Sequence, residues 1–398
     1  MTATAKPCQP PYSGLRVLEF AEDPAGELLG RLLAEMGADV TKIEPPEGSP
    51  SRAVGPFASG AQGLETSLNF RFYNSNKKSV VLGLADGLAA LDALLAEADI
   101  FISTLQPQAL DALGLDLHAL VAAHPKLIVV SVTAFGLDGP WANYRSSDLV
   151  GLALGGPLNS CGYDDHSIPP IRPGGNQAYH TATSFAHIGA LLALLERQNT
   201  GKGQLVDVSM HEGLAVNVEL ANPYWFYPRV DVHRQTCRHA QPSPTQPTLF
   251  RCADDRLIYY TLILSDRRAW QALVAWMAEK GMDAGLGDEA YLDLAYRQER
   301  FQEVQTIVEC FFLIQTGAEA FHEAQARGLP IGILNAPEEL FDDPHFKARD
   351  FFVPVQEADG AAVLYPGPSY RFTAFDAVPR VRAPKLGEHT QGGMEAVR

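Results

Sequence analysis

The alternation of hydrophobic and polar residues near the start of the chain predicts a strand, a helix and a second strand. A short apolar run at 15–18 predicts the first strand, and leucine and methionine side chains at helical spacing within 28–36 predict the helix. Gly37 follows the helical pattern, as is typical of a helix end. Another apolar run at 40–43 predicts the second strand. A strand–helix–strand unit favours a parallel sheet of Rossmann type.

The stretch from 169 to 212 has the clearest pattern in the middle of the chain. A loop rich in proline and glycine comes first, and Thr200–Gly203 predicts a sharp turn before a short buried strand at 205–210. Between the loop and the turn, apolar residues recur at helical spacing: Ala182, Phe185, Ala186, Gly189, Leu192 and Leu195. The pattern alone is typical of a helix–turn–strand unit in an α/β protein.

Similar patterns predict further elements along the rest of the chain. The predicted strands are 99–102, 127–132 and 257–263, the predicted helices are 87–98, 269–280 and 297–316, and a helix start is predicted at 146–149. Residues 224–227 form an aromatic cluster. Such a cluster suits an aromatic substrate and also packing in a core or an interface.

The composition limits the class of protein. The chain has 398 residues, a net charge of -16 and 46% hydrophobic residues, which favours a globular protein and argues against nucleic acid or an anionic membrane as a partner. No G-x-G-x-x-G motif follows the first strand, which argues against a dinucleotide. The number of cysteines is odd and they form no C-x-x-C motif, which indicates a reducing compartment. The sequence also has no apolar run of membrane-spanning length and no signal-peptide pattern. Together these observations predict a soluble cytoplasmic protein.

Residues 197–212 read RQNTGKGQLVDVSMHE. This segment resembles the R-x-x-TGKGQ-x-VDVSM segment of the class III CoA-transferases, the CaiB/BaiF family, which move coenzyme A between carboxylic acids. Residues 16–52 resemble the opening of that family, 74–84 resemble its NxxKxSxxLDL motif, and the APKLGEHT segment near the C-terminus matches its closing motif. The resemblance covers residues 15–390.

The resemblance implies a fold, an assembly and substrates. The fold would be the α/β class III CoA-transferase fold, with a Rossmann-like large domain built from residues 1–222 and 328–398 and a smaller α+β domain, residues 223–327, inserted between them. The assembly would be an interlocked dimer in which one chain threads the ring of the other. Coenzyme A or acyl-CoA and a small carboxylic acid would be the substrates, and no metal would be needed.

The resemblance also implies contacts with coenzyme A near the ends of the strands. These would come from Leu82, Thr104, Leu105, Thr133, Ala134 and Phe135. Phe135 can equally be interpreted as an ordinary aromatic residue at the end of a strand. The family's ENFRPG segment is replaced by residues 103–108, and an Arg that family members direct at a CoA phosphate aligns with Ala112. Loss of such a contact removes a charge-assisted hydrogen bond of about 1.5–3 kcal/mol.

The nucleophile that the resemblance implies is missing at its usual position. In the family an Asp carboxylate attacks the acyl-CoA to form an anhydride and then an aspartyl-CoA thioester, and this Asp lies 21 positions before the Thr of TGKGQ. That position is Tyr179, with His180 beside it, and no Asp or Glu lies between Asp165 and Glu196. Tyr179 is either a nucleophile or a residue with a packing or pocket-lining role. His180 is either the general base for Tyr179 or a histidine at a helix start that is bonded to the backbone.

The leading hypothesis is therefore a nucleophile-lacking subunit of a heteromeric class III CoA-transferase, similar to the subunit of that kind in succinyl-CoA:benzylsuccinate-type enzymes. A homologous subunit would carry the catalytic Asp. The proline-rich segment 240–247, which is expected to be stiff where many family members have a mobile glycine-rich loop, favours the same hypothesis. The alternatives are a self-sufficient homodimeric lyase or hydratase using Tyr179 and His180, and a CoA-binding protein without catalysis.

Overall fold

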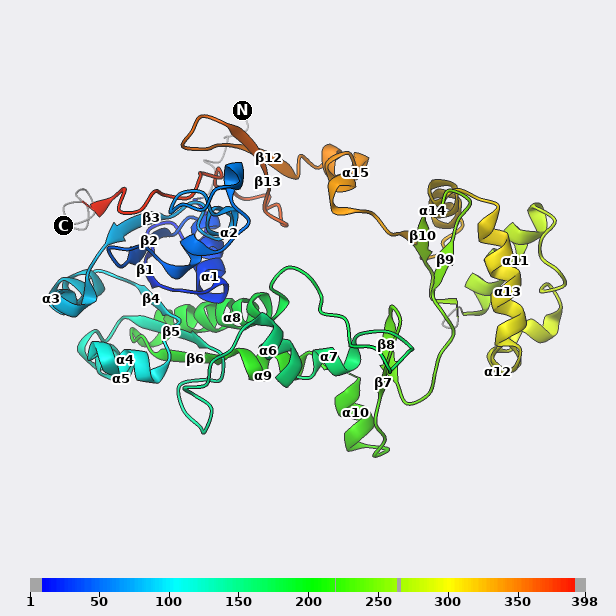
Figure 1. Ribbon diagram of the computed structural model, residues 1–398, viewed down its shortest axis with the longest axis horizontal. Coiled ribbons are helices and arrows are strands. Elements are labelled where there is room, and N and C mark those ends of the chain that lie inside the picture. The colour runs from blue at the N-terminus through cyan, green and yellow to red at the C-terminus, as the bar shows by residue number, and fades with distance from the viewer. Residues whose placement is uncertain (1–8, 219, 263–265, 391–398) are drawn as a thin grey trace, which may run out of the picture. The chain divides into compact units, whose positions relative to one another are not determined.

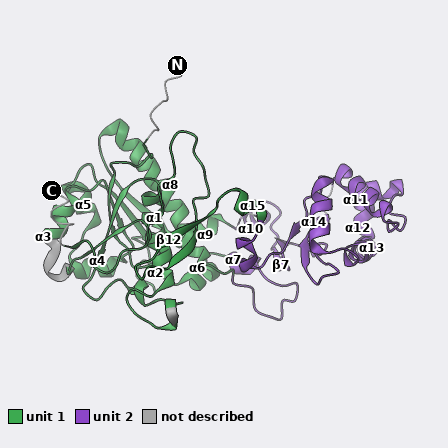
Figure 2. Ribbon diagram, turned by 90° about the horizontal axis from the view of Figure 1, so that it is seen from above, with its two compact units in different colours: residues 1–156, 173–217, 344–398 green, residues 157–172, 218–343 purple. Residues whose placement is uncertain are grey.

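The computed structural model describes residues 9–218, 220–262 and 266–390. The chain forms two compact units, which Figure 2 shows in different colours. The large unit comprises 1–156, 173–217 and 344–398, and the small unit comprises 157–172 and 218–343. The sequence places the changes of domain after 222 and 327, whereas the units change after 217 and 343 and the small unit also takes in 157–172.

The large unit is built on a six-stranded sheet in which every neighbouring pair of strands is parallel (Figure 1). The spatial order is β3 (Lys78–Val81), β2 (Asp39–Glu44), β1 (Arg16–Phe20), β4 (Ile100–Ser103), β5 (Ile128–Thr133) and β6 (Leu205–Ser209). The residues of β4 and β5 are buried throughout, as expected of central strands covered on both faces. The prediction of a Rossmann-type parallel sheet is confirmed.

Helices and short elements complete the large unit. The helices are α1 (Pro24–Glu35), α2 (Leu68–Tyr73), α3 (Leu84–Leu95), α4 (Pro107–Leu113), α5 (Leu117–Ala123), α6 (Asp148–Leu154), α8 (Gln177–Thr200), α9 (Met210–Val216) and α15 (Pro344–Ala348). The hairpin β12 (Phe352–Gln356) and β13 (Ala362–Pro366) and the 3-10 turns η1 (Pro50–Ala53) and η2 (Ala58–Gly60) belong to the same unit. Helix α6 begins after its N-cap Ser147, whose hydroxyl accepts a hydrogen bond from the backbone N–H of Val150, so the predicted helix start is confirmed.

Helix α8 buries small residues and exposes large apolar ones. It packs against α1, β5 and β6 through a row of small residues: Ala178, Ala182, Ala186, Ala190 and Ala193. Leu192 and Leu195 are 61% and 58% exposed. The helix predicted from this spacing is present, and its two leucines lie outside the core that its alanines join.

The small unit has its own hydrophobic core, which contains Trp270, Trp276, Phe311 and Phe312. Its antiparallel sheet has the order β11 (Gly332–Ile333), β10 (Leu257–Tyr259) and β9 (Leu249–Arg251). The other elements are α7 (Pro157–Ser160), α10 (Ala221–Phe226), β7 (His233–Gln235), β8 (Arg238–Gln241), α11 (Arg267–Glu279), η4 (Glu289–Leu292), α12 (Leu294–Glu299), α13 (Phe301–Leu313), α14 (Gly317–Ala326) and η5 (Pro337–Phe341).

Two element predictions in the small unit need correction. The helix predicted at 297–316 is divided into α12 and α13 because Arg300 leaves helical geometry, with φ -108° and ψ 21°. The strand predicted at 257–263 ends at Tyr259, and residue 263 lies outside the described residues.

Candidate functional site

A cavity of about 320 Å³ opens at the carboxyl end of the parallel sheet. Its wall contains Glu22 and Asp23 after β1, Thr104 to Gln106 after β4, and the end of β5. Strands β1 and β4 are neighbours, but the chain continues from β1 to β2 on one side and from β4 to β5 on the other. Open α/β sheets bind ligands in the crevice at such a topological switch point, and this volume lies within the usual range for ligand pockets.

Tyr179 reaches this cavity from the first turn of α8. The carboxylate of Asp148 in α6 fixes the start of that helix, because its Oδ1 accepts a hydrogen bond of 2.8 Å from the backbone N–H of Ala178. Burial, and secondarily the carboxylates of Asp23 and Asp148, raise the pKa of Tyr179 to about 12. At neutral pH Tyr179 is therefore a neutral phenol that can donate a hydrogen bond.

His180 does not line the cavity. Its Nε2 lies 2.8 Å from the hydroxyl of Tyr73 in α2, and the side-chain amide of Asn176 donates to the same hydroxyl at 3.2 Å. Burial lowers the pKa of His180, and the carboxylate of Asp148 acts against this shift. His180 therefore lies outside the cavity, although it directly follows Tyr179 in the sequence.

Asp23 is a site residue that the sequence analysis missed. It is the N-cap of α1, and its Oδ1 accepts hydrogen bonds from the backbone N–H groups of Ala25 and Gly26, at 3.0 and 3.4 Å. Burial raises the pKa of this carboxyl to about 7, although both backbone hydrogen bonds oppose the rise. The Asp-Pro pair at a helix start signals an N-cap, but only the fold shows that this N-cap lines a cavity.

The residues expected to contact coenzyme A divide into two groups. Thr104, Leu105, Thr133 and Ala134 line the cavity together with Tyr179. Leu82 packs against the hydrophobic core of the large unit. Phe135 packs against the rings of Trp141 and His211, with centroid distances of 5.9 and 5.7 Å.

The TGKGQ motif forms the connection from α8 to β6. Gly201 is the C-cap of α8 and has a positive φ of 72°, a conformation that favours glycine. A Cβ atom at Gly203 would lie 1.9 Å from the carbonyl oxygen of Leu127, so only glycine permits this approach to the start of β5. The motif thus positions α8 and β6 and is not part of the cavity wall.

A family comparison identifies the chain. Residues 12–390 match the model for CoA-transferase family III. The chain belongs to this family. It is 31% identical to the succinyl-CoA:(R)-benzylsuccinate CoA-transferase subunit BbsE of Thauera aromatica, over 96% of this chain and 92% of that protein.

The chain is also similar to a second curated relative and to a solved structure. The succinyl-CoA–L-malate CoA-transferase beta subunit of Chloroflexus aurantiacus is 28% identical, over 96% of this chain and 92% of that protein. The crystal structure of a CaiB/BaiF family protein from Brucella suis has a TM-score of 0.83 and 25% identity, and the match covers 98% of this chain and all of that one. The α/β fold predicted from the resemblance is therefore confirmed.

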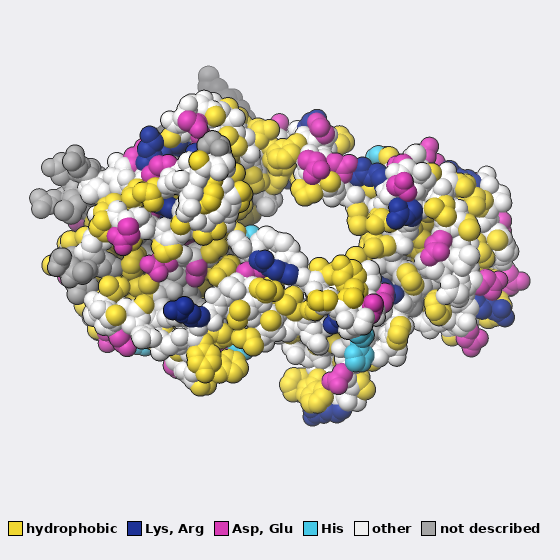
Figure 3. Space-filling view, viewed as in Figure 1, with side chains coloured by type: hydrophobic (Ala, Val, Ile, Leu, Met, Phe, Trp, Pro, Cys, Tyr) yellow, Lys and Arg dark blue, Asp and Glu magenta, His cyan; other side chains and the backbone are white. Residues whose placement is uncertain are grey.

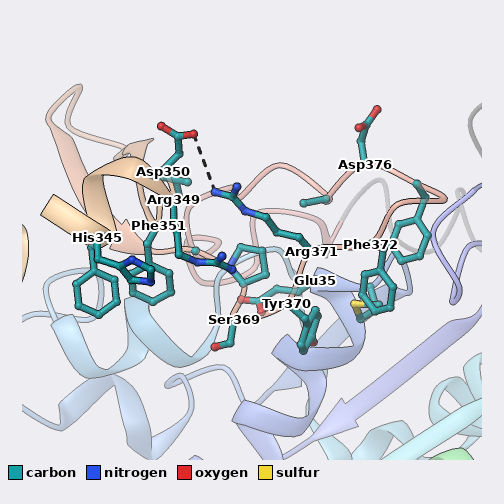
Figure 4. A pocket seen from close by; sticks show the side chains of 17 residues that line it. Glu35, His345, Arg349, Asp350, Phe351, Ser369, Tyr370, Arg371, Phe372 and Asp376 are labelled. Atoms are coloured by element: carbon teal, nitrogen blue, oxygen red, sulfur yellow. Dashed lines mark ion pairs between the residues drawn. The ribbon is translucent and has the colours of Figure 1, made fainter. Parts of the chain in front are cut away.

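This family III chain has a second cavity, of about 560 Å³, in its large unit. The wall combines aromatic rings with cationic groups, and Figure 4 shows Arg349 and Arg371 between Phe351 and Phe372. The guanidinium of Arg371 lies 4.0 Å from the carboxylate of Asp350, and both side chains are mostly exposed. Because these walls come from residues 345–377 and the end of α1, this cavity is separate from the ends of the parallel strands.

The described part of the chain contains neither a cluster of metal-ligating side chains nor a helix able to span a membrane. Across residues 9–218, 220–262 and 266–390, no group of three or more His, Cys, Asp or Glu side chains is arranged to hold a metal ion. Within the same described ranges, no helix combines the length and the apolar character that crossing a membrane requires.

Proposed function

We propose that this chain is the subunit of a heteromeric class III CoA-transferase that lacks the nucleophilic Asp. The enzyme would move coenzyme A from an acyl-CoA such as succinyl-CoA to another carboxylic acid. The observation that carries this proposal is Tyr179, which lies at the family's nucleophile position and also lines the cavity at the switch point. A phenol whose pKa is about 12 is a poor substitute for a carboxylate that must form an anhydride.

The cavity would hold the pantetheine end of the acyl-CoA. Its wall has no Lys or Arg among the described residues, and it includes the hydroxyls of Thr104 and Thr133 beside the apolar Leu105 and Val132. Such a wall suits the neutral amides and thioester of the pantetheine arm. The phosphates would lie outside it, since a doubly charged group needs cationic donors nearby.

A homologous subunit carrying the catalytic Asp would be the partner, in an interlocked dimer. Two relatives are themselves named as subunits. The exposed side of α8 supports a partner, because Phe185, Ile188, Leu191, Leu192 and Leu195 leave a row of large apolar side chains uncovered along one helix.

Helix α10 of the small unit presents a second apolar group. Trp225, Phe226 and Tyr227, at α10 and directly after it, are 52%, 64% and 85% exposed, and Figure 3 shows hydrophobic side chains gathered at this helix. The aromatic cluster seen in the sequence is thus not packed in the core of its own chain. These three aromatic side chains would lie in the interface with the partner subunit.

The hydrogen bonds of the proline-rich segment 240–247 in the small unit also favour a subunit that assists catalysis without carrying it out. The side-chain carbonyl of Gln235 accepts hydrogen bonds from both the backbone N–H and the hydroxyl of Thr245, at 2.6 and 2.9 Å. The amide of Gln246 donates to the carbonyl oxygen of Phe301 at 3.3 Å. A loop tied in this way is less able to close over a reaction intermediate.

The alternative of a self-sufficient lyase or hydratase based on Tyr179 and His180 is less well supported. A general base must reach the proton that it removes. His180 instead shares a hydrogen bond with Tyr73 and lies outside the cavity wall.

Native mass spectrometry of the chain, tagged and purified from its own source, tests the proposal. We expect a one-to-one complex with a second chain of similar mass, and CoA transfer from succinyl-CoA only by that complex. Replacing the partner's nucleophilic Asp should abolish transfer, while Tyr179→Phe in this chain should leave detectable transfer. A homodimer that transfers CoA unaided would contradict the proposal, and a homodimer that binds CoA without transfer would indicate a binding protein.

A further inference from the structure

The cavity of about 560 Å³ in the large unit is lined by the end of α1 together with two segments near the C-terminus. Residues between 345 and 353 lead from α15 into β12, and residues between 367 and 377 follow β13. The antiparallel pairing of β12 with β13 places these segments side by side, and the backbone N–H of Gly367 donates to the carbonyl oxygen of Phe351 at 2.6 Å. The volume lies within the range of about 300–1,000 Å³ that pockets for small molecules have.

Aromatic rings line this cavity in two groups. In one group the ring centroids of Phe346 and Phe351 are 5.0 Å apart. In the other group Phe372 stacks on Phe375 with a centroid distance of 4.4 Å, and Tyr370 lies edge-on to Phe372 at 5.4 Å. Figure 4 shows Phe351 and Phe372 on opposite sides of the arginine side chains. Because aromatic rings attract one another in stacked and edge-to-face arrangements, a ligand that carries an aromatic ring has partners in this wall.

Two carboxylates of the wall have arginine partners. The Nε of Arg31 donates to Glu35 Oε1 at 2.7 Å, and Arg380 forms an ion pair with the same oxygen. Asp350 lies 4.0 Å from the guanidinium of Arg371, and Figure 4 marks this ion pair. These partners reduce the negative charge that the two carboxylates present to a ligand.

Arg349 differs from these arginines, because its guanidinium has no hydrogen-bond or ion-pair partner among the described residues. Its side chain lines the cavity and is exposed, so a ligand can reach it. Figure 4 shows Asp376, the third acid of the wall, with its carboxylate pointing away from Arg349. A guanidinium binds a carboxylate through two parallel hydrogen bonds, and Arg349 is therefore available to bind an acid.

Two hydroxyl groups add to the donors around Arg349. Ser369 and Tyr370 line the cavity, and within the described ranges neither hydroxyl has a hydrogen-bond partner. Burial raises the pKa of Tyr370 above its usual value, so its phenol is a neutral donor at neutral pH. A ligand group with two negative charges would lack a second unpaired arginine, because Arg371 already faces Asp350. The donors therefore suit a single negative charge.

We propose that this cavity binds a small aromatic acid with one negative charge. The carboxylate of the acid binds the guanidinium of Arg349, and its ring packs against the aromatic side chains of the wall. The site goes beyond the proposed function, because its wall shares no residue with the cavity that would hold the acyl-CoA. Binding at this site therefore requires neither coenzyme A nor a nucleophilic Asp.

Isothermal titration calorimetry with 2-naphthoate tests this proposal. The complete chain is used in the oligomeric form in which it purifies. We expect one binding site per chain, with an affinity that does not change in excess coenzyme A. The uncharged analogue 2-naphthamide has the same ring system and should bind about 10-fold more weakly or worse, because it cannot form the charge-assisted hydrogen bonds with Arg349.

Two variants assign the groups that bind the acid. Arg349→Gln should weaken the binding of 2-naphthoate by about 10- to 100-fold, because the charge-assisted hydrogen bonds are lost. Phe372→Ala should weaken it by about 5-fold, because the ring loses an aromatic partner; Phe372 is 48% exposed, so the fold does not depend on it. Lys347→Gln is the matched control. It removes the same charge from α15, outside the cavity wall, and should leave the affinity unchanged.

Four results would overturn the proposal. They are the absence of 2-naphthoate binding, equal affinities for 2-naphthoate and 2-naphthamide, equal effects of Arg349→Gln and Lys347→Gln, and displacement of 2-naphthoate by coenzyme A. Displacement would place the acid in the cavity at the carboxyl end of the parallel sheet. None of these results contradicts the proposed function, which is tested separately by CoA transfer.

Discussion

Glu19, Lys42 and Lys77 form a fully buried ion cluster in the large unit. Glu19 Oε1 lies 3.1 Å from Lys42 Nζ, and Glu19 Oε2 lies 2.7 Å from Lys77 Nζ. Lys42 also pairs with Glu27 at 2.9 Å.

Glu19→Gln should destabilise the protein by about 3–5 kcal/mol, because it leaves two buried ammonium groups with one carboxylate fewer. Urea unfolding measures the change in the free energy of unfolding. Glu97→Gln is the control, since its ion pair with Arg16 is exposed on both sides and should contribute less than about 1 kcal/mol. Equal effects of the two substitutions would show that burial does not strengthen the role of Glu19.

The connection between α8 and β6 depends on two glycines for different reasons. Gly203→Ala should cost on the order of 3 kcal/mol or more, because the added Cβ would meet the backbone of Leu127. Gly201→Ala has open space around it and should cost only about 1–2 kcal/mol, for its left-handed conformation. Lys202→Ala, between them, should change the stability little. Thermal unfolding of the three variants would contradict this account if Gly201→Ala proved the most harmful.

At the scale of the whole molecule, the exposed apolar row on α8 should be covered by the partner subunit. Leu192→Asp should weaken or abolish copurification of the partner while leaving the thermal unfolding of the isolated chain nearly unchanged, because Leu192 is already 61% exposed. Ala119→Asp adds the same charge to an exposed position of another helix of the large unit, α5, and should keep the complex intact. Loss of stability without loss of the partner would argue against an interface on this face.

The sequence by itself determined the large sheet, the start of α6 and the family, because apolar runs, helical spacing, N-caps and the TGKGQ motif are local signals. It also placed Thr104, Leu105, Thr133, Ala134 and Tyr179 at element ends, where the structure brings them to one cavity. Only the tertiary structure decided which face of α8 is buried, because the choice depends on how closely α1 and the sheet approach. It also decided that Asp23 lines the cavity and His180 does not, because both outcomes depend on how the elements pack together.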